Sequence, residues 1–161
     1  MDHAIIRRAA VADVDELVAM RRDFTFEDEA SRTRTSRPEF EAECRDFLTD
    51  AISSSNWDIW VAEVGGQIVS HVYVALIDKV PRPVRGYRRI AYMTNVYTRP
   101  PHRASGIGGR LVERAQEAAR ERDVELMIVW PSEESIAFYK RHGFREASSD
   151  EPLIWESDSP P

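Results

Sequence analysis

Three strand-like runs follow one another in the middle of the chain and restrict its fold more than any other feature. They are 57–64 (WDIWVAEV), 67–77 (QIVSHVYVALI) and 89–98 (RIAYMTNVYT). All three are rich in the β-branched and aromatic residues that favour strands. Gly65-Gly66, between the first two runs, is typical of a two-residue hairpin turn. Because hairpin-joined strands pair antiparallel, we expect this part of the chain to form a largely antiparallel sheet.

Apolar residues recur at helical spacing on both sides of these strands. A capping-box pattern at Asp13 and Glu16 predicts a helix that ends near Asp23, and Pro38 suits the first turn of a second helix. The polar segment 24–37 between them is expected to be a loop. The other predicted elements are a strand at 4–10, a third helix from Ile107, a buried strand at 125–130, a short helix that stops at Gly143 and a last strand at 152–156. This order predicts an α/β or α+β fold.

Length and charge narrow the classes of protein that this chain can represent. The 161 residues suit one domain, which we predict over 1–156, with a flexible tail at 157–161. The net charge of −6 makes nucleic acid an unexpected partner. No stretch approaches the roughly 20 apolar residues of a membrane span, and no apolar core of a signal peptide is present. We therefore expect a cytoplasmic protein with no membrane partner.

Cys44 is the only cysteine, and it lies on the predicted apolar face of the second helix. An internal disulfide is therefore impossible, and the sequence has no Cys/His spacing typical of a metal site. We expect Cys44 to be a core thiol and no metal to be bound.

A run of small residues precedes the third predicted helix. It reads Arg103-Ala104-Ser105-Gly106-Ile107-Gly108-Gly109. The unpaired N–H groups at a helix N-terminus attract phosphate when small residues let it approach. A nucleotide-binding Walker loop would need Lys-Ser/Thr where Arg110-Leu111 stand. A dinucleotide fingerprint would need a third glycine where Leu111 stands, and it opens a parallel unit rather than following antiparallel strands.

The run matches Arg-x-x-Gly-x-Gly, so it resembles the pyrophosphate loop of the GNAT N-acetyltransferases. Residues 95–100 (NVYTRP) are similar to that family's fourth strand and its exit, and 137–144 (AFYKRHGF) to its FY…GF signature. The opening Ile6-Arg7-Arg8-Ala9 with Asp13 also resembles the superfamily. The resemblance covers nearly the whole chain in order. It implies one domain with a mixed, mostly antiparallel twisted sheet of six to seven strands and about four helices. The strands at 89–98 and 125–130, the family's fourth and fifth, would be splayed apart.

The resemblance also implies that acetyl-CoA, or another acyl-CoA, is the acyl donor. An N–H near Val96 would polarise the thioester carbonyl. Ala104-Ser105 replaces the family's usual Gly-basic pair, which we expect to cost little backbone access. Arg103 would add charge or brace the loop. The pyrophosphate would lie on the N–H groups of Arg103, Ala104, Ser105, Gly106, Ile107, Gly108 and Gly109, and the pantetheine arm would run beside Val96, Tyr97, Thr98, Ser132, Ser135, Phe138 and Tyr139. Ser132 stands where many relatives have Asn, and we expect it to cap the last helix as well.

In the implied reaction, an amine attacks the thioester directly in a ternary complex. Tyr139 occupies the family's general-acid position and would protonate the leaving thiolate. Many relatives carry a basic carboxylate on the fourth strand, whereas this strand has none, so Asn95 would hold a water or orient the amine. The proton acceptor stays open between Glu63, Asp78 and His71, which are candidates by location only.

The acceptor and two alternative functions stay open at this point. Arg82, Arg85, Arg88 and Arg89 would favour an acceptor with a phosphate or carboxylate, whereas the acidic residues 27–29 would attract a cationic amine. The acceptor is a small-molecule or protein amine, and a homodimer through the tail strand near Ile154 is possible. A non-catalytic acyl-CoA sensor on the same fold and a nucleotide-binding phosphate loop are the alternatives.

Overall fold

The computed structural model describes residues 3–28 and 37–148. The chain divides into two compact units, Met1–Trp130 and Pro131–Pro161. The first unit holds a sheet and three α-helices, and the second holds one short α-helix. The α+β class is confirmed, although the described residues contain five strands and not the six to seven predicted. The strand predicted at 152–156 lies outside the described residues.

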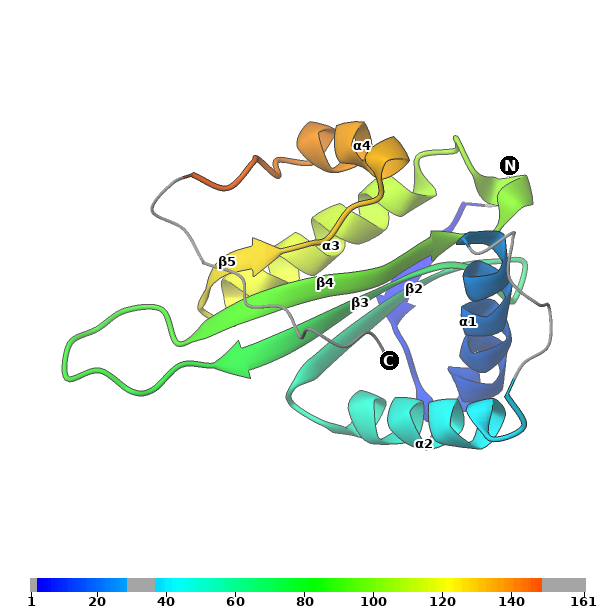
Figure 1. Ribbon diagram of the computed structural model, residues 1–161, viewed down its shortest axis with the longest axis horizontal. Coiled ribbons are helices and arrows are strands. Elements are labelled where there is room, and N and C mark those ends of the chain that lie inside the picture. Colours follow the sequence, from blue (N-terminus) through cyan, green and yellow to red (C-terminus); the bar gives the residue numbers. More distant parts are fainter. Residues whose placement is uncertain (1–2, 29–36, 149–161) are drawn as a thin grey trace. The chain divides into compact units, whose positions relative to one another are not determined.

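The strands of the first unit lie side by side in the order in which the chain makes them (Figure 1). The first four pair antiparallel, and the last pairs parallel to its neighbour. The hairpin predicted at Gly65 and Gly66 is confirmed, because both residues have the positive φ, +58° and +80°, of a tight hairpin turn. The strands are β1 (Ile5–Arg8), β2 (Trp57–Val64), β3 (Gln67–Asp78), β4 (Arg89–Thr98) and β5 (Val124–Ile128).

β4 and β5 pair along only part of their length. The pairing starts at Arg89 and Val124 and ends at Tyr92 and Ile128, whereas β4 continues to Thr98. The predicted divergence of these two strands therefore agrees with the sheet. The expectation that 125–130 is a buried strand is wrong, since the residues of β5 are half-buried or exposed. The reason is that β5 is an edge strand of this five-stranded sheet.

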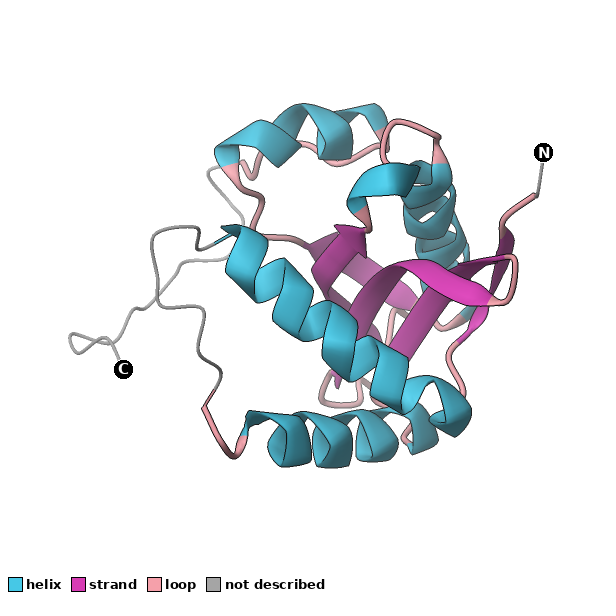
Figure 2. Ribbon diagram, turned by 90° about the vertical axis from the view of Figure 1, so that its right-hand side faces the viewer, coloured by secondary structure: helices cyan, strands magenta, loops and turns pink. Residues whose placement is uncertain are grey.

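Helices cover both faces of the sheet (Figure 2). On one face, α1 (Val14–Asp28) and α2 (Phe40–Ser53) bury Leu17, Met20 and Leu48 against Val61 and Ile68 of β2 and β3. On the other face, α3 (Ile107–Glu121) packs against β2, β3, β4 and β5. Its buried stripe consists of Ile107, Gly109, Leu111, Val112, Ala115, Ala118 and Ala119. The apolar residues that recur at helical spacing in this part of the sequence lie on this buried face.

α1 extends to Asp28, so the prediction of a loop from residue 24 onward is wrong for the first residues of that segment. Contacts with residues far along the chain stabilise this added turn, and the local sequence pattern does not reveal them. Phe24 stacks on Tyr97 of β4, with ring centroids 5.2 Å apart, and the hydroxyl of Tyr97 donates to Glu27 at 2.8 Å. α2 begins at Phe40, after a turn that contains Pro38, and Cys44 packs against the core with partial exposure.

The second unit contains α4 (Ile136–Arg141), which ends in a Schellman motif. Gly143 has φ +83° and donates its N–H to Lys140, and the N–H of Phe144 donates to the carbonyl of Tyr139 at 3.1 Å. The rings of Phe144 and Tyr139 lie 5.4 Å apart, which is the apolar contact that accompanies this motif. The predicted helix stop at Gly143 is confirmed.

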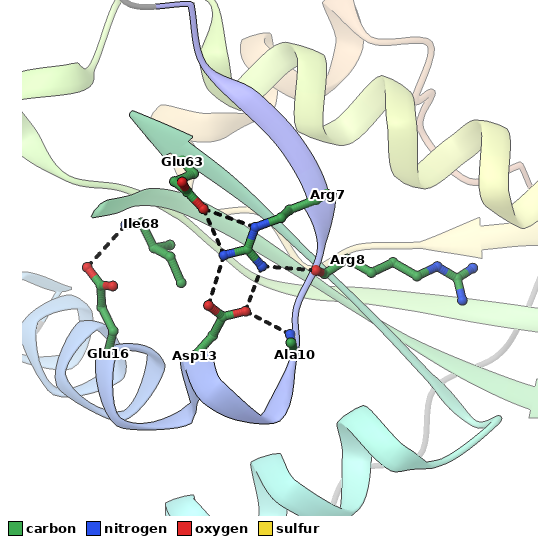
Figure 3. A network of polar contacts seen from close by, with 7 residues as sticks. All are labelled: Arg7, Arg8, Ala10, Asp13, Glu16, Glu63 and Ile68. Atoms are coloured by element: carbon green, nitrogen blue, oxygen red, sulfur yellow. Dashed lines mark hydrogen bonds and ion pairs between the residues drawn. The ribbon is translucent and has the colours of Figure 1, made fainter. Parts of the chain in front are cut away.

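Arg7 joins β1, β2 and the start of α1 in one ion network (Figure 3). Its guanidinium donates to both carboxylate oxygens of Asp13, at 2.7 and 2.9 Å, and to Oε2 of Glu63 at 2.9 and 3.0 Å. Asp13 also accepts the N–H of Ala10 at 2.7 Å. The hydrogen bond from Arg7 holds the pKa of Asp13 below its usual range. The Arg7 and Asp13 of the opening motif therefore anchor the edge strand to the first helix.

Replacing Asp13 with Asn is expected to lower the free energy of unfolding by about 2–3 kcal/mol, because Arg7 loses its bidentate charged partner. Asp13 has a lower pKa folded than unfolded, so its contribution is complete above about pH 4 and is lost as pH falls through the folded pKa. Urea unfolding between pH 3 and 7 measures both effects. Asp15→Asn is the control, since the exposed Asp15–Arg45 pair is worth about 0–1 kcal/mol. Equal losses in the two variants would contradict the prediction.

Candidate functional site

β4 carries a bulge at Asn95 and Val96. His71 of β3 pairs with Tyr97, and Tyr73 pairs with Thr94, so two residues of β4 lie opposite the single residue Val72. Asn95 has φ +51°, a left-handed conformation that Asn tolerates better than most residues. Bulges redirect a strand and are frequent beside active sites.

Beyond the bulge, the backbone of β4 turns alternate peptide groups away from β3. The carbonyl of Tyr97 accepts the hydroxyl of Ser70 on β3 at 2.9 Å, and the N–H of Arg99 donates to Val69 of β3 at 2.8 Å. Because successive residues of a strand direct their polar groups to opposite sides, Val96 and Thr98 face away from β3. They face the side on which β5 has already ended. Both are among the residues beside which the pantetheine arm was predicted to run.

Residues 103–106 of the predicted pyrophosphate loop are exposed and lead into the N-terminus of α3. Gly106 is the N-cap and has no side-chain cap, and the N–H of Arg110 is bonded to its carbonyl at 3.1 Å. The N–H groups of residues 107–109 precede that bond and have no acceptor within the helix. A Cβ on Gly106 would meet no atom within 4 Å, so the space beside this N-cap residue is open. The arrangement suits an anion at the positive end of the helix.

Ala104 in the same loop has φ +57°. Left-handed conformation costs an L-residue about 1–2 kcal/mol relative to the right-handed region, and Gly is free of that cost. The exposed position of Ala104 leaves the backbone accessible, as expected, but its conformation is strained. Sequence pattern does not reveal such strain, since it depends on the path of the loop.

Arg103 braces the loop. Its Nε donates to the carbonyl of Thr98 at 2.9 Å, its Nη2 is paired with Glu27 of α1, and its guanidinium lies 5.6 Å from the ring centre of Tyr97. Burial alone would raise the pKa of Glu27, but the hydrogen bonds from Arg103 and Tyr97 outweigh burial and hold that pKa below its ordinary value. Burial and the neighbouring Glu27 raise the pKa of Tyr97 to about 12. Sequence reasoning missed this link, because Glu27 lay in a predicted loop.

Only one of the three candidate proton acceptors lies at the bulge. Glu63 lies on β2, two strands away from β4, and is bound to Arg7 of β1. Asp78 is paired with Arg89. Arg89 and Asn95 are separated along β4 by roughly 20 Å at about 3.3 Å per residue. His71 is fully buried, and its Nδ1 lies 2.7 Å from the carbonyl oxygen of Asn95. Burial lowers the pKa of His71 to about 4, so the ring is neutral near pH 7 and is a weak base.

The side chain of Asn95 is held by α1. Its Oδ1 accepts a hydrogen bond from Arg21 of α1 at 3.2 Å. The buried hydroxyl of Tyr73 and the Nε2 of His71 have no hydrogen-bond partner among the described residues. The bulge therefore lies in a polar cluster that brings β3, β4 and α1 together.

The other predicted site residues belong to the second unit. Ser132 is the N-cap of a short 3-10 turn, and its hydroxyl bonds to the hydroxyl of Ser135 at 3.1 Å rather than to a backbone N–H. The expectation that Ser132 caps the last helix is therefore wrong, because Ser135 holds the N-cap position of α4. Phe138 and Tyr139 contact each other edge to face, and Tyr139 is buried. The general-acid role of Tyr139 stays a prediction.

The structure also shows where the two groups of charged residues lie that were expected to attract the acceptor. The loop with Arg82, Arg85 and Arg88 lies at the opposite end of β4 from Thr98 (Figure 1). Because that end is roughly 20 Å from Asn95, a small acceptor cannot contact both. Glu27 is paired with Arg103 and accepts the hydroxyl hydrogen of Tyr97, so its carboxylate already has partners within the protein. The side chain of Asp28, and Glu29, lie outside the described residues.

Membrane-spanning helices and metal clusters are both absent from the described residues. No described helix has the length and apolar character that crossing a membrane requires. The described part of the chain also contains no group of three or more His, Cys, Asp or Glu side chains that could hold a metal ion.

Comparisons with known proteins agree with the loop motif. A family model described as "Acetyltransferase (GNAT) domain" matches residues 55–146. The chain is 32% identical over 95 residues to an uncharacterized N-acetyltransferase of Methanocaldococcus jannaschii, which covers 54% of this chain and 38% of that protein. It is 32% identical over 65 residues to a glucosamine 6-phosphate N-acetyltransferase of Trypanosoma brucei brucei, which covers 40% of this chain and 44% of that protein. The chain thus spans less than half the length of these curated relatives.

The fold is similar to a crystal structure of a predicted acetyltransferase with acetyl-CoA from Clostridium acetobutylicum. The two have a TM-score of 0.74 and 25% sequence identity, and the match covers 94% of this chain and 96% of that one. The resemblance inferred from the motifs is confirmed.

Proposed function

Since the chain belongs to the GNAT acetyltransferase family, we propose that it transfers an acetyl group from acetyl-CoA to a primary amine. One observation carries the proposal. The peptide groups of Val96 and Thr98 that face away from β3 lead along the end of β4 to the N–H groups of residues 107–109 at the start of α3. This track suits a ligand with an extended amide arm and a diphosphate. The similar Clostridium acetobutylicum protein is described with acetyl-CoA, which supports the same donor.

In the proposed complex, the loop from Arg103 to Gly109 holds the pyrophosphate and the edge of β4 holds the pantetheine arm. The N–H of Val96 donates to the thioester oxygen as negative charge develops there. The amine nitrogen attacks the carbonyl carbon, so a carbon–nitrogen bond forms and the carbon–sulfur bond breaks. The phenol of Tyr139 gives its proton to the departing thiolate.

Proton removal from the amine needs no basic side chain of β4. Alkyl ammonium groups have pKa values of about 10, so only a small fraction of the amine is neutral at pH 7. His71 is buried with a pKa of about 4, and Glu63 and Asp78 are paired elsewhere. We infer that the neutral amine binds, or loses its proton to solvent, with Asn95 orienting it. The kcat/KM of the reaction should then rise with pH toward the pKa of the amine.

The acceptor class is a small-molecule amine or a protein amine. The Trypanosoma brucei brucei relative is named for glucosamine 6-phosphate, which supports testing phosphorylated amino sugars. The separation of the basic loop from the bulge argues against that loop as the phosphate site of a small acceptor.

A non-catalytic acyl-CoA sensor is the second candidate. It is favoured by the sequence of β4, which has no carboxylate, and by the engagement of Glu63 and Asp78 in ion pairs away from the bulge. It predicts acetyl-CoA binding without thiol release.

Two measurements on the purified full chain test both candidates. Titration calorimetry with CoA and acetyl-CoA reports binding, and a thiol-release assay with an amine panel reports transfer. The panel contains polyamines, amino acids, glucosamine 6-phosphate and lysine peptides, and products are identified by a mass increase of one acetyl group. Binding with acetylation supports the proposal, and binding without transfer to any amine supports the sensor. Absence of CoA binding contradicts both.

A further inference from the structure

We propose that His71 is a positioning residue that fixes the Asn95–Val96 peptide group and thereby aims the N–H of Val96 at the thioester carbonyl. The inference rests on the proposed function and extends it to a residue that touches neither substrate.

The hydrogen bond at His71 determines which nitrogen carries the proton. Its Nδ1 lies 2.7 Å from the carbonyl oxygen of Asn95. A carbonyl oxygen only accepts, so Nδ1 carries the hydrogen and Nε2 has the lone pair. The ring is completely buried, so bulk solvent does not compete for this contact. His71 therefore donates one well-directed hydrogen bond to the bulge.

The rigidity of the peptide group transmits this bond to Val96. The carbonyl of Asn95 and the N–H of Val96 belong to one planar trans peptide, so they point in opposite directions. No cis peptide bond occurs in the described chain. Holding the carbonyl of Asn95 toward His71 on β3 therefore directs the N–H of Val96 away from β3. A rotation of this peptide group would misdirect the proposed oxyanion donor.

The carbonyl of Asn95, at the bulge, needs a hydrogen-bond donor from outside the regular strand pairing. A bulge leaves one residue outside the regular ladder, and its polar groups must find other partners. Here the left-handed φ of Asn95 turns its carbonyl out of the ladder, and His71 replaces the missing backbone donor. Arg21 of α1 also holds the side-chain oxygen of Asn95, at 3.2 Å. The left-handed residue is thus fixed by both its main chain and its side chain.

Aromatic packing fixes the orientation of the imidazole. Its ring centre lies 5.0 Å from that of Tyr73 and 5.7 Å from that of Tyr97, and Tyr97 is itself stacked on Phe24. The same enclosure gives Nε2 no described hydrogen-bond partner, which does not suit a proton relay. Positioning, rather than proton transfer, is the role that the geometry supports.

Three substitutions separate the hydrogen bond from the volume of the ring. In His71→Asn the side-chain amide nitrogen lies at the place of Nδ1 and keeps the donor. In His71→Gln the amide lies near the place of Nε2, and His71→Leu has no donor. We expect His71→Gln and His71→Leu to lower kcat about 10- to 100-fold, below the full effect of removing an oxyanion donor. We expect His71→Asn to stay within about fivefold of the wild type, and the Kd for CoA to change less than about threefold in all three.

Val74→Ala is the matched control for stability. Val74 is also buried on β3 but lies outside the bulge, so its truncation is expected to lower Tm without lowering kcat. A wild-type kcat in both His71→Gln and His71→Leu would overturn the inference. So would equal losses of kcat in His71→Asn and His71→Leu, because the donor would then be irrelevant.

Nitrogen-15 NMR tests the geometry without turnover. The neutral ring of His71 should show a protonated Nδ1 and a bare Nε2, and the amide signal of Val96 should move in His71→Leu more than in His71→Asn. The opposite tautomer, or an unmoved Val96 signal in His71→Leu, would overturn the inference. If no amine is acetylated, the proposed function fails and these spectra alone decide whether His71 holds the bulge.

Discussion

Tyr139→Phe is expected to lower kcat by about 10²-fold or more, within the 10²–10⁴-fold range of general-acid catalysis. The substitution removes the phenol proton that the departing thiolate needs. It keeps the ring, which contacts Phe138 and Phe144, so the packing around the end of α4 is retained. The Kd for CoA measured by calorimetry should stay within about threefold. Steady-state thiol release with the best amine of the panel measures kcat.

A second tyrosine makes this prediction specific. Tyr87→Phe is the control, because Tyr87 is exposed on the loop between β3 and β4. A wild-type kcat in Tyr139→Phe would remove the phenol from the mechanism.

Gly106→Val is expected to weaken CoA binding by about 100-fold or more. A Cβ at this N-cap residue projects into open space, and we expect the larger side chain to obstruct the pyrophosphate that is proposed to lie at the N-terminus of α3. Loss of the close approach removes several charge-assisted hydrogen bonds from backbone N–H groups. The backbone φ of +79° adds a strain of about 1–2 kcal/mol for an L-residue. Calorimetry gives the Kd, and thermal unfolding gives the loss of stability.

Gly66→Val separates strain from obstruction. Gly66 has φ +80°, and a Cβ added to it would also meet no atom within 4 Å, but it lies in the turn between β2 and β3. Its substitution should reduce stability about as much as Gly106→Val and leave CoA binding unchanged. Normal CoA affinity in Gly106→Val would show that the pyrophosphate lies elsewhere.

The elements that could be predicted from sequence are those whose formation depends on residues close together in the chain. β2 and β4 have the bounds that were predicted, because alternating β-branched and aromatic residues between turn signals favour strands wherever they occur. Gly65-Gly66 and Gly143 were recognised because their turns require positive φ. The loop before α3 was noted for a different reason, since its small residues would let a ligand approach the backbone closely.

The site residues that sequence reasoning missed have partners far along the chain. Glu27 is held by Tyr97 and Arg103, and its helix extends past Asp23 because Phe24 stacks on the same tyrosine. Glu63 and Asp78 were proton-acceptor candidates by location, and ion pairs with Arg7 and Arg89 engage them elsewhere. Such pairings depend on how strands and helices come together, which no local pattern contains.

The order of residues alone determined the strands, the hairpin, the start of α3 and the membership of an acetyltransferase family, because each has a short-range or motif-level cause. The direction of the Asn95–Val96 peptide group does not follow from it. At Asn95 the main-chain carbonyl meets a buried imidazole from the neighbouring strand, and the side chain meets a guanidinium from α1. Their meeting results from packing of the sheet and helix, since hydrogen bonds between distant residues form only where the fold brings donor and acceptor within reach.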